Sequence, residues 1–325
     1  MKTKELFDRL FAQKDVLVAD GAMGTNLFEL GLADGASSEL WNLQFPERVL
    51  GVHRSFVNAG ADIILSNTFG ANRFRLDLHN LTGRVRELNM AGAEIARRAS
   101  EQSGRQMLVA GSIGPTGDVM APLGTRTVAE AEEAFHEQAD ALKEGGVDVA
   151  WIETMYSNEE LCAAVAGVSR AGLPYVATMN FDTGGCTMMG VRPDDAMRKV
   201  SSLECKPLAF GANCGVGPAQ LIDSVLGVAS AAEEGDRIVA KANCGLPEIG
   251  KDMKARYNGT PAMMAIYACM ARAAGASIIG GCCGTRAEHI QAMAAALAGT
   301  SRGPAPTYGE IEASLGPVRR TAPLA

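Results

Sequence analysis

The sequence predicts a single (β/α)8 barrel, and three observations support this prediction. Short runs of β-branched and other apolar residues alternate with amphipathic helical stretches along almost the whole chain. About eight such strand–helix units fit into about 300 residues, the count and size expected of this fold. No break in composition marks a second domain, so we assign residues 1–300 to the barrel and residues 301–325 to a C-terminal tail or arm. An open, doubly wound sheet is the competing architecture.

Each strand candidate is a short, mostly apolar run that ends at a glycine or a polar residue. These runs are 16–19, 62–66, 107–111, 148–152, 175–179, 207–211, 237–241 and 277–280. Helical candidates with apolar residues at helical spacing fill the intervals, at 46–59, 84–100, 128–144, 158–171, 193–202, 218–232, 261–274 and 286–298. The pattern of the first ten residues predicts one more amphipathic helix. These residues lack the apolar centre of a signal peptide.

The composition of the chain argues against several classes of function. Hydrophobic residues make up 47% of the chain and charged residues 21%, which is typical of a globular protein rather than a disordered one. The net charge of −7 gives no electrostatic reason to bind nucleic acid or an anionic membrane. No apolar run reaches the roughly 18 residues that span a bilayer. Without a secretion signal, eight cysteines indicate metal ligands and buried thiols rather than disulfides, and we expect a cytoplasmic protein.

Polar and thiol residues follow the strand candidates at their carboxyl ends. In a barrel these ends form one rim, where the chemistry takes place. The residues concerned are Asp20, Asn67, Ser112, Glu153, Asn180, Asn213, Asn243 and Cys282. The four histidines all fall within or beside helical stretches, which argues against a histidine-based catalytic triad.

Two adjacent cysteines, Cys282 and Cys283, stand where the last strand candidate ends. Neighbouring side chains of an extended strand point to opposite sides, but glycine on both sides of this pair allows the backbone to kink. A third thiolate would complete a zinc site. Cys214 is the leading candidate, although Cys244 lies in a nearly identical Ala-Asn-Cys-Gly motif and the chemistry barely separates the two. Three cysteines would leave the fourth position open, as catalytic zinc needs, whereas four would close a structural site. We expect the remaining cysteines to be small buried residues: Cys162, Cys186, Cys205 and Cys269.

Two carboxylates at the rim predict a receptor for an ammonium group. Asp20 follows an apolar run and precedes a Gly-Ala-Met-Gly turn, where its alternative role is to cap that turn. Glu153 ends a strand after Trp151, where an unpaired carboxylate would be costly. The backbone amides of Gly21 and Ala22 are then available to a substrate carboxylate.

Four motifs together resemble the zinc-dependent homocysteine S-methyltransferases: 20–25 (Asp-Gly-Ala-Met-Gly-Thr), 67–69 (Asn-Thr-Phe), 211–214 (Gly-Ala-Asn-Cys) and 280–285 (Gly-Gly-Cys-Cys-Gly-Thr). The resemblance covers roughly residues 10–298. It implies a (β/α)8 barrel with Zn²⁺ held by Cys214, Cys282 and Cys283, and it leaves Cys244 as an extra thiol. It also implies that Asp20 and Glu153 hold the amino group of homocysteine, with the amides of Gly21 and Ala22 near its carboxylate. From the second motif we add Thr68 to the substrate-binding candidates.

The family resemblance leaves the methyl donor open. The family that the sequence resembles includes betaine–homocysteine methyltransferases, S-methylmethionine-dependent enzymes and the homocysteine half of cobalamin-dependent methionine synthase. We expect transfer from a small onium donor, glycine betaine first, to homocysteine, giving methionine. The alternatives are a sulfonium donor (S-methylmethionine or dimethylsulfoniopropionate) and an acceptor module that works with a corrinoid- or folate-dependent system. A homo-oligomer is compatible with either.

Aromatic residues near the rim are the candidates for binding a quaternary ammonium or sulfonium group. Such a group cannot donate hydrogen bonds, so aromatic faces recognise it. Trp41 matches a donor-site tryptophan of the betaine-dependent family, and Phe69 and Tyr156 lie close to rim motifs. Animal betaine enzymes have a tyrosine directly after the glutamate, where this chain has Thr154, so the cage must be built differently. The simpler interpretation is that Trp41 and Phe69 only cover the mouth of the barrel.

Overall fold

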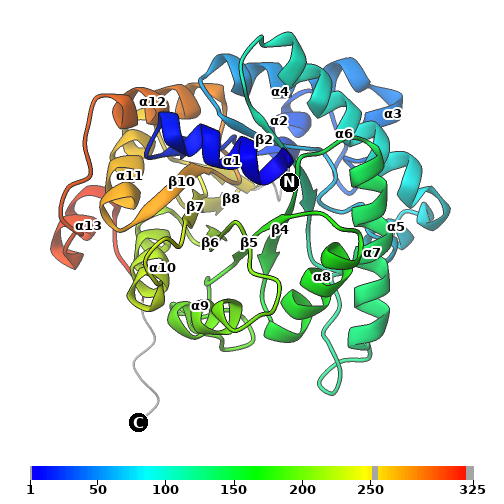
Figure 1. The fold of residues 1–325 in the computed structure, drawn as a ribbon. Helices are drawn as coiled ribbons and strands as arrows, with labels where there is room; N and C mark the ends of the chain where they lie inside the picture. The colour runs from blue at the N-terminus through cyan, green and yellow to red at the C-terminus, as the bar shows by residue number, and fades with distance from the viewer. Residues whose placement is uncertain (1, 251–254, 320–325) are drawn as a thin grey trace.

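The structure, a computed structural model, describes residues 2–250 and 255–319. It is a barrel of eight parallel strands surrounded by helices, which confirms the predicted fold (Figure 1). The strands follow the order β1-β10-β7-β6-β5-β4-β3-β2. A bridge between Ala19 and Ile63, beside the hydrogen bond from the Asp62 amide to the Val18 carbonyl at 2.7 Å, brings the two ends of the sheet together. The sheet is therefore a barrel and not the open alternative.

All eight predicted barrel strands are present: β1 (Leu17–Val18), β2 (Ile63–Leu65), β3 (Leu108–Ile113), β4 (Val149–Met155), β5 (Tyr175–Met179), β6 (Ala209–Cys214), β7 (Ile238–Ala242) and β10 (Ala276–Gly281). The predicted helices are present as well: α1 (Lys2–Gln13), α4 (Pro46–Asn58), α6 (Val85–Gln102), α7 (Val128–Glu144), α8 (Asn158–Arg170), α9 (Pro193–Ser201), α10 (Pro218–Ala231), α11 (Pro261–Ala273) and α12 (Ala287–Ala298). None of the described helices is both long and apolar enough to cross a membrane.

Several short elements were not predicted. They are α2 (Met23–Glu29), α3 (Trp41–Gln44), α5 (Arg73–Asp77), the 3-10 helix η1 (Thr82–Arg84), the hairpin of β8 (Pro247–Ile249) with β9 (Ala255–Tyr257), and α13 (Tyr308–Leu315). Apart from α13, all of them lie in connections that follow the carboxyl ends of barrel strands. They therefore build up the rim at which the site lies.

The interior of the barrel is filled by the inward-facing half of each strand. Because side chains alternate across a strand, Leu65 and Trp151 face the barrel axis while Ile64 and Ile152 face the helices. Phe7 and Leu10 of α1 join the interior cluster, and α1 lies across the amino-terminal end of the barrel (Figure 1). That end is thereby closed by apolar side chains.

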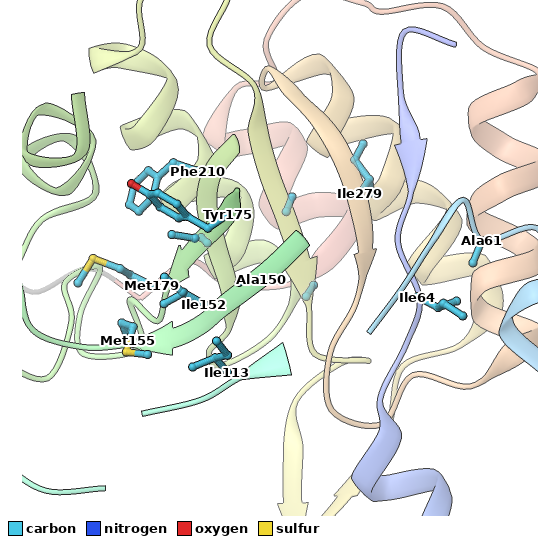
Figure 2. Close-up of a cluster of buried hydrophobic side chains, with 14 of the residues drawn as sticks. Ala61, Ile64, Ile113, Ala150, Ile152, Met155, Tyr175, Met179, Phe210 and Ile279 are labelled. Carbon is cyan, nitrogen blue, oxygen red and sulfur yellow. The ribbon is translucent and has the colours of Figure 1, made fainter. Parts of the chain in front are cut away.

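The outward-facing half of each strand packs against the surrounding helices. Figure 2 shows part of this layer, in which Ile64, Ile113, Ile152, Phe210 and Ile279 come from different strands. Both faces of the sheet are buried, which is why the strands appear in the sequence as continuous apolar runs. The eight strand ends are consequently held in fixed register.

Part of the segment that we assigned to a tail forms a helix against the barrel. α13 buries Ile311 and Leu315 against α10 and α11. The hydroxyl of Tyr308 donates to Asp223 at 2.8 Å, and the amide of Arg319 donates to the side-chain oxygen of Gln220. Residues 320–325 of the tail lie outside the described residues.

One buried histidine predicts how stability depends on pH. His53 of α4 is fully buried, and neither ring nitrogen has a hydrogen-bond partner among the described residues. Burial lowers the pKa of His53 to about 4, from a usual value near 6.5. The unfolded chain therefore binds this proton more readily, so the contribution of His53 is fully present above pH 6.5 and is lost as the pH falls towards 4.

We expect wild-type protein to lose about 2.5 kcal/mol of unfolding free energy through His53 between pH 7.5 and 4.5. The variant His53→Leu should lack this component. Urea denaturation of both proteins at several pH values gives the free energy of unfolding of each as a function of pH. The contribution of His53 is the part of the difference between wild type and His53→Leu that changes with pH. A difference that stays constant with pH would contradict the prediction.

Candidate functional site

Three cysteine thiols meet at the carboxyl-terminal rim of the barrel. β6 ends at Cys214, and β10 ends one residue before Cys282 and Cys283, with β7 between the two strands. The three Sγ atoms lie within 4.8 Å of one another, and no further His, Cys, Asp or Glu of the described chain joins this group. Cys244 follows β7 but packs into the apolar layer outside the barrel. The structure thus groups the three cysteines that the family resemblance implies.

Our expectation for the remaining cysteines was too simple. Cys205 is exposed, so its predicted burial is wrong. Cys162, Cys186 and Cys269 are partly buried. All four lie outside the cluster of three thiols.

Two asparagines brace the backbone that carries the thiols. Cys214 adopts a left-handed conformation with φ +65°, which costs energy for any residue other than glycine. The side chain of Asn243 accepts from the Cys283 amide at 3.0 Å and donates to the Gly215 carbonyl, so it ties both cysteine loops together. Asn213 accepts from the Thr154 amide at 2.9 Å and donates to the Thr154 hydroxyl at 2.8 Å. Both copies of the Asn-Cys-Gly motif therefore supply an asparagine that fixes a loop of the site, but only one copy supplies a thiol of the cluster.

The spacing and chemistry of the cluster fit a zinc ion. Three thiolates at the usual Zn–S distance of about 2.3 Å have their sulfurs about 3.8 Å apart, which the cluster can reach with little movement. Hydrogen bonds to Cys282 and Cys283, together with burial, raise the pKa of Cys214 well above its usual value. Three ionised thiols this close repel one another, and a dication would relieve that repulsion. Cys214, Cys282 and Cys283 are thus suited to hold zinc with one position open.

The predicted carboxylate Glu153 lies in an irregular part of β4. The pairing of β4 with β5 shifts between Ile152 and Met155, and Thr154 has φ +64°. Glu153 is buried and accepts a hydrogen bond from the Ser112 hydroxyl at 2.5 Å. Burial raises the pKa of Glu153 to about 7, although Lys241 opposes the rise. Because burial disfavours the ionised form of Glu153, a cationic ligand beside it would stabilise the carboxylate.

The predicted carboxylate Asp20 already has a cationic partner. Its Oδ1 lies 2.7 Å from Nζ of Lys241 on β7, and both side chains are only 2% exposed. Its Oδ2 accepts from the Leu65 amide at 2.7 Å. The sequence interpretation missed Lys241 because it stands at the end of an apolar strand candidate. The signal was there: a lysine in a buried strand must be paired.

The other predicted acceptor residues take part in the scaffold of the rim. The Ala22 amide donates to the Thr285 carbonyl at 3.2 Å. A side chain at Gly21 would meet that same carbonyl at 2.8 Å and the Phe56 ring at 2.7 Å, so glycine is required there. Thr68 is fully buried and donates to the Ser112 carbonyl at 2.8 Å.

The three aromatic donor-site candidates have different surroundings. Trp41 is buried, and the centre of its ring lies 4.9 Å from the centre of the Phe45 ring. The guanidinium carbon of Arg48 lies 5.2 Å from the centre of the Trp41 ring. Phe69 is 37% exposed, and its ring lies over Gly114, where a side chain would approach it to 2.6 Å. Tyr156 is half-buried and donates to the Asp118 carbonyl at 3.2 Å.

Comparison with known proteins places this geometry among relatives. The family profile described as homocysteine S-methyltransferase matches residues 17–297. Methionine synthase of Mycobacterium tuberculosis (strain ATCC 25618 / H37Rv) is 34% identical over 303 residues, and that of Mycobacterium leprae (strain TN) is 32% identical over 307 residues. These alignments cover 88% and 90% of this chain but only 25% of each relative. The chain thus spans about a quarter of the length of the curated relatives that it matches.

A solved structure with the same fold is the metallated form of the homocysteine methyltransferase MmuM from Escherichia coli. The TM-score is 0.75, with coverage of 89% of this chain and 99% of that chain. The oxidized form of the same protein has the same score and coverage. At 23% sequence identity, this likeness concerns the fold.

Proposed function

Since the chain belongs to the homocysteine S-methyltransferase family, we propose that it is a zinc-dependent enzyme that methylates the thiol of homocysteine to give methionine. The observation that carries this proposal is the cluster of Cys214, Cys282 and Cys283, whose Sγ atoms lie within 4.8 Å of one another at the barrel rim. Eight unpaired cysteines also support a reducing compartment, and we propose the cytoplasm.

The residues around the cluster support an amino-acid thiol as the acceptor. Bound zinc would lower the pKa of the acceptor thiol and keep it ionised at neutral pH. Glu153, held by Ser112, is the group that would receive the ammonium of homocysteine. Asn213 and Asn243 keep the cysteine loops in place, so that the thiol of the acceptor is held at one point relative to Glu153. Positioning of this kind can supply several kcal/mol of the activation barrier.

For the methyl donor we propose a small onium compound, glycine betaine first. The support is that an aromatic residue stands in each of the connections that follow β1, β2 and β4: Trp41, Phe69 and Tyr156. The guanidinium group of Arg48 already lies against the Trp41 ring, as expected for a ring that attracts cations. Arg48 therefore occupies part of the ring face that a donor would need. Phe69, which is partly exposed, is therefore the ring that we expect to contribute most to donor binding.

A second candidate donor is a methyl group carried by another protein or domain. Two observations favour it: the relatives named methionine synthase are about four times as long as the matched region, and Leu123 in the connection between β3 and α7 is 77% exposed. In that case the chain would be an acceptor module for a corrinoid- or folate-dependent system.

The two donors are separated by assaying purified zinc-loaded protein with homocysteine and one donor at a time. We expect methionine from glycine betaine or from a sulfonium compound with no second protein, and loss of product after chelation that added zinc reverses. Product formed with methylated corrinoid protein alone would overturn the onium donor. No product from either class would overturn the proposed function.

The variant Phe69→Ala tests the aromatic donor site. We expect it to raise the KM for the onium donor about tenfold, the loss of one cation–π contact, and to leave the KM for homocysteine within about twofold. Phe69 is a better probe than Trp41, whose removal from a buried position would also cost stability. Phe45→Ala, at an exposed ring that packs against Trp41, is the matched control and should change neither constant. An unchanged donor KM in Phe69→Ala would remove Phe69 from the site.

A further inference from the structure

A buried ammonium group of the protein itself lies beneath the candidate acceptor site. Lys241 stands one residue before the end of β7, the strand between the two that carry the cysteines. Its Nζ lies 2.7 Å from Asp20 and 5.7 Å from the centre of the Trp151 ring, which belongs to the apolar filling of the barrel. The lysine thus sits at the boundary between that filling and the polar rim.

We propose that Lys241 is a positioning residue that holds Asp20 and neutralises its charge, so that the site selects an aminothiol that carries a carboxylate over one that lacks it. This inference rests on the proposed function, because it concerns the same acceptor. It also changes the role of Asp20, which becomes the anchor of Lys241 rather than a direct ligand of the substrate amine.

The contacts of the two carboxylates support this division of roles. Both oxygens of Asp20 are engaged, one by Lys241 and the other by the Leu65 amide. Within the described part of the chain, Glu153 accepts a hydrogen bond from the neutral Ser112 hydroxyl and forms no ion pair of its own. The amine of an incoming amino acid therefore has one carboxylate to pair with, Glu153.

Charge complementarity explains the selectivity. Homocysteine bound as a thiolate carries one ammonium and one carboxylate, so it brings one more negative charge than the same molecule without its carboxylate. Lys241 cancels the charge of Asp20. Without the lysine, the uncompensated Asp20 carboxylate would repel the more negative ligand, and this repulsion is strong in a buried site. The pKa of Lys241 supports a charged state: burial would lower it, but Asp20 and Glu153 raise it above its usual value.

The first test uses metal-free protein and needs no activity. Lys241→Met removes the charge and keeps the length of the side chain, leaving Asp20 buried without its partner. We expect its Tm to fall by about 10 °C, and the double variant Lys241→Met with Asp20→Asn to recover at least half of that loss. Lys241→Arg keeps the charge and should fall less. No recovery in the double variant would mean that the two groups do not act as a pair, and would overturn the proposal.

The second test measures selectivity by calorimetry on zinc-loaded protein, with homocysteine and with 3-mercaptopropylamine, which lacks the carboxylate. In Lys241→Met we expect the preference for homocysteine to fall about tenfold, a change of about 1.4 kcal/mol. Lys241→Arg and the double variant should keep it within about threefold of wild type. A merely structural role would weaken both ligands equally, and that result would overturn the proposal. If wild-type protein binds neither thiol, the proposed function itself fails.

Discussion

Replacing any one of Cys214, Cys282 and Cys283 with alanine is expected to release zinc and to reduce methyl transfer at least about a thousandfold, because thiol activation and positioning are both lost. The three sulfurs lie within 4.8 Å of one another, so each would supply one ligand to the same ion. With two ligands left, the ion cannot keep a tetrahedral site with a single open position.

Cys244→Ala is the matched control, since its motif nearly copies that of Cys214 one strand away. Cys244 is buried in the outer apolar layer, so the variant should lose some stability but keep zinc and activity. Metal content by atomic emission and methionine formation measure both quantities. If Cys244→Ala releases zinc while Cys214→Ala keeps it, the assignment of ligands is wrong.

The fold could be predicted because both faces of the barrel strands are buried. Each strand then appears as an unbroken apolar run, and the helix between two runs has an apolar stripe. The ends of the strands were harder to predict. β3, β4 and β6 each continue further than the sequence indicates, because Ser112, Glu153 and Asn213 are polar but still lie in the strands. These polar residues line the candidate site, so the apolar pattern does not predict the strand ends at that site.

The parts of the site that sequence reasoning missed depend on contacts between distant residues. The ion pair of Asp20 with Lys241 joins residues 221 positions apart, and nothing close to either one encodes the other. The choice between Cys214 and Cys244 could not be made from the two motifs alone, since both follow strands with the same local pattern. Packing separates the two thiols, because Cys244 lies in the outer apolar layer while the side chain of Asn243 reaches across to Gly215 and Cys283.

Glu153→Gln is expected to weaken homocysteine binding about 10- to 100-fold, the loss of one charge-assisted contact, while zinc content stays normal. The sign of the pH effect follows from the environment of the carboxyl group. Burial raises the pKa of Glu153 to about 7, so at pH 6 it is mostly neutral and at pH 8 mostly ionised. Because the ionised form would pair with the ammonium, wild-type affinity should rise from pH 6 to pH 8, by a step that Glu153→Gln lacks.

Calorimetric titration of zinc-loaded protein with homocysteine across this pH range measures both effects, and the titration of the homocysteine thiol cancels when the two proteins are compared. Glu160→Gln is the matched control, because Glu160 is also a buried glutamate near the rim but is bound to the amide and hydroxyl of Thr116. It should leave homocysteine affinity unchanged. Equal affinities and equal pH profiles for wild type and Glu153→Gln would exclude Glu153 from the amine site, and the ammonium of the acceptor would then have to compete with Lys241 for Asp20.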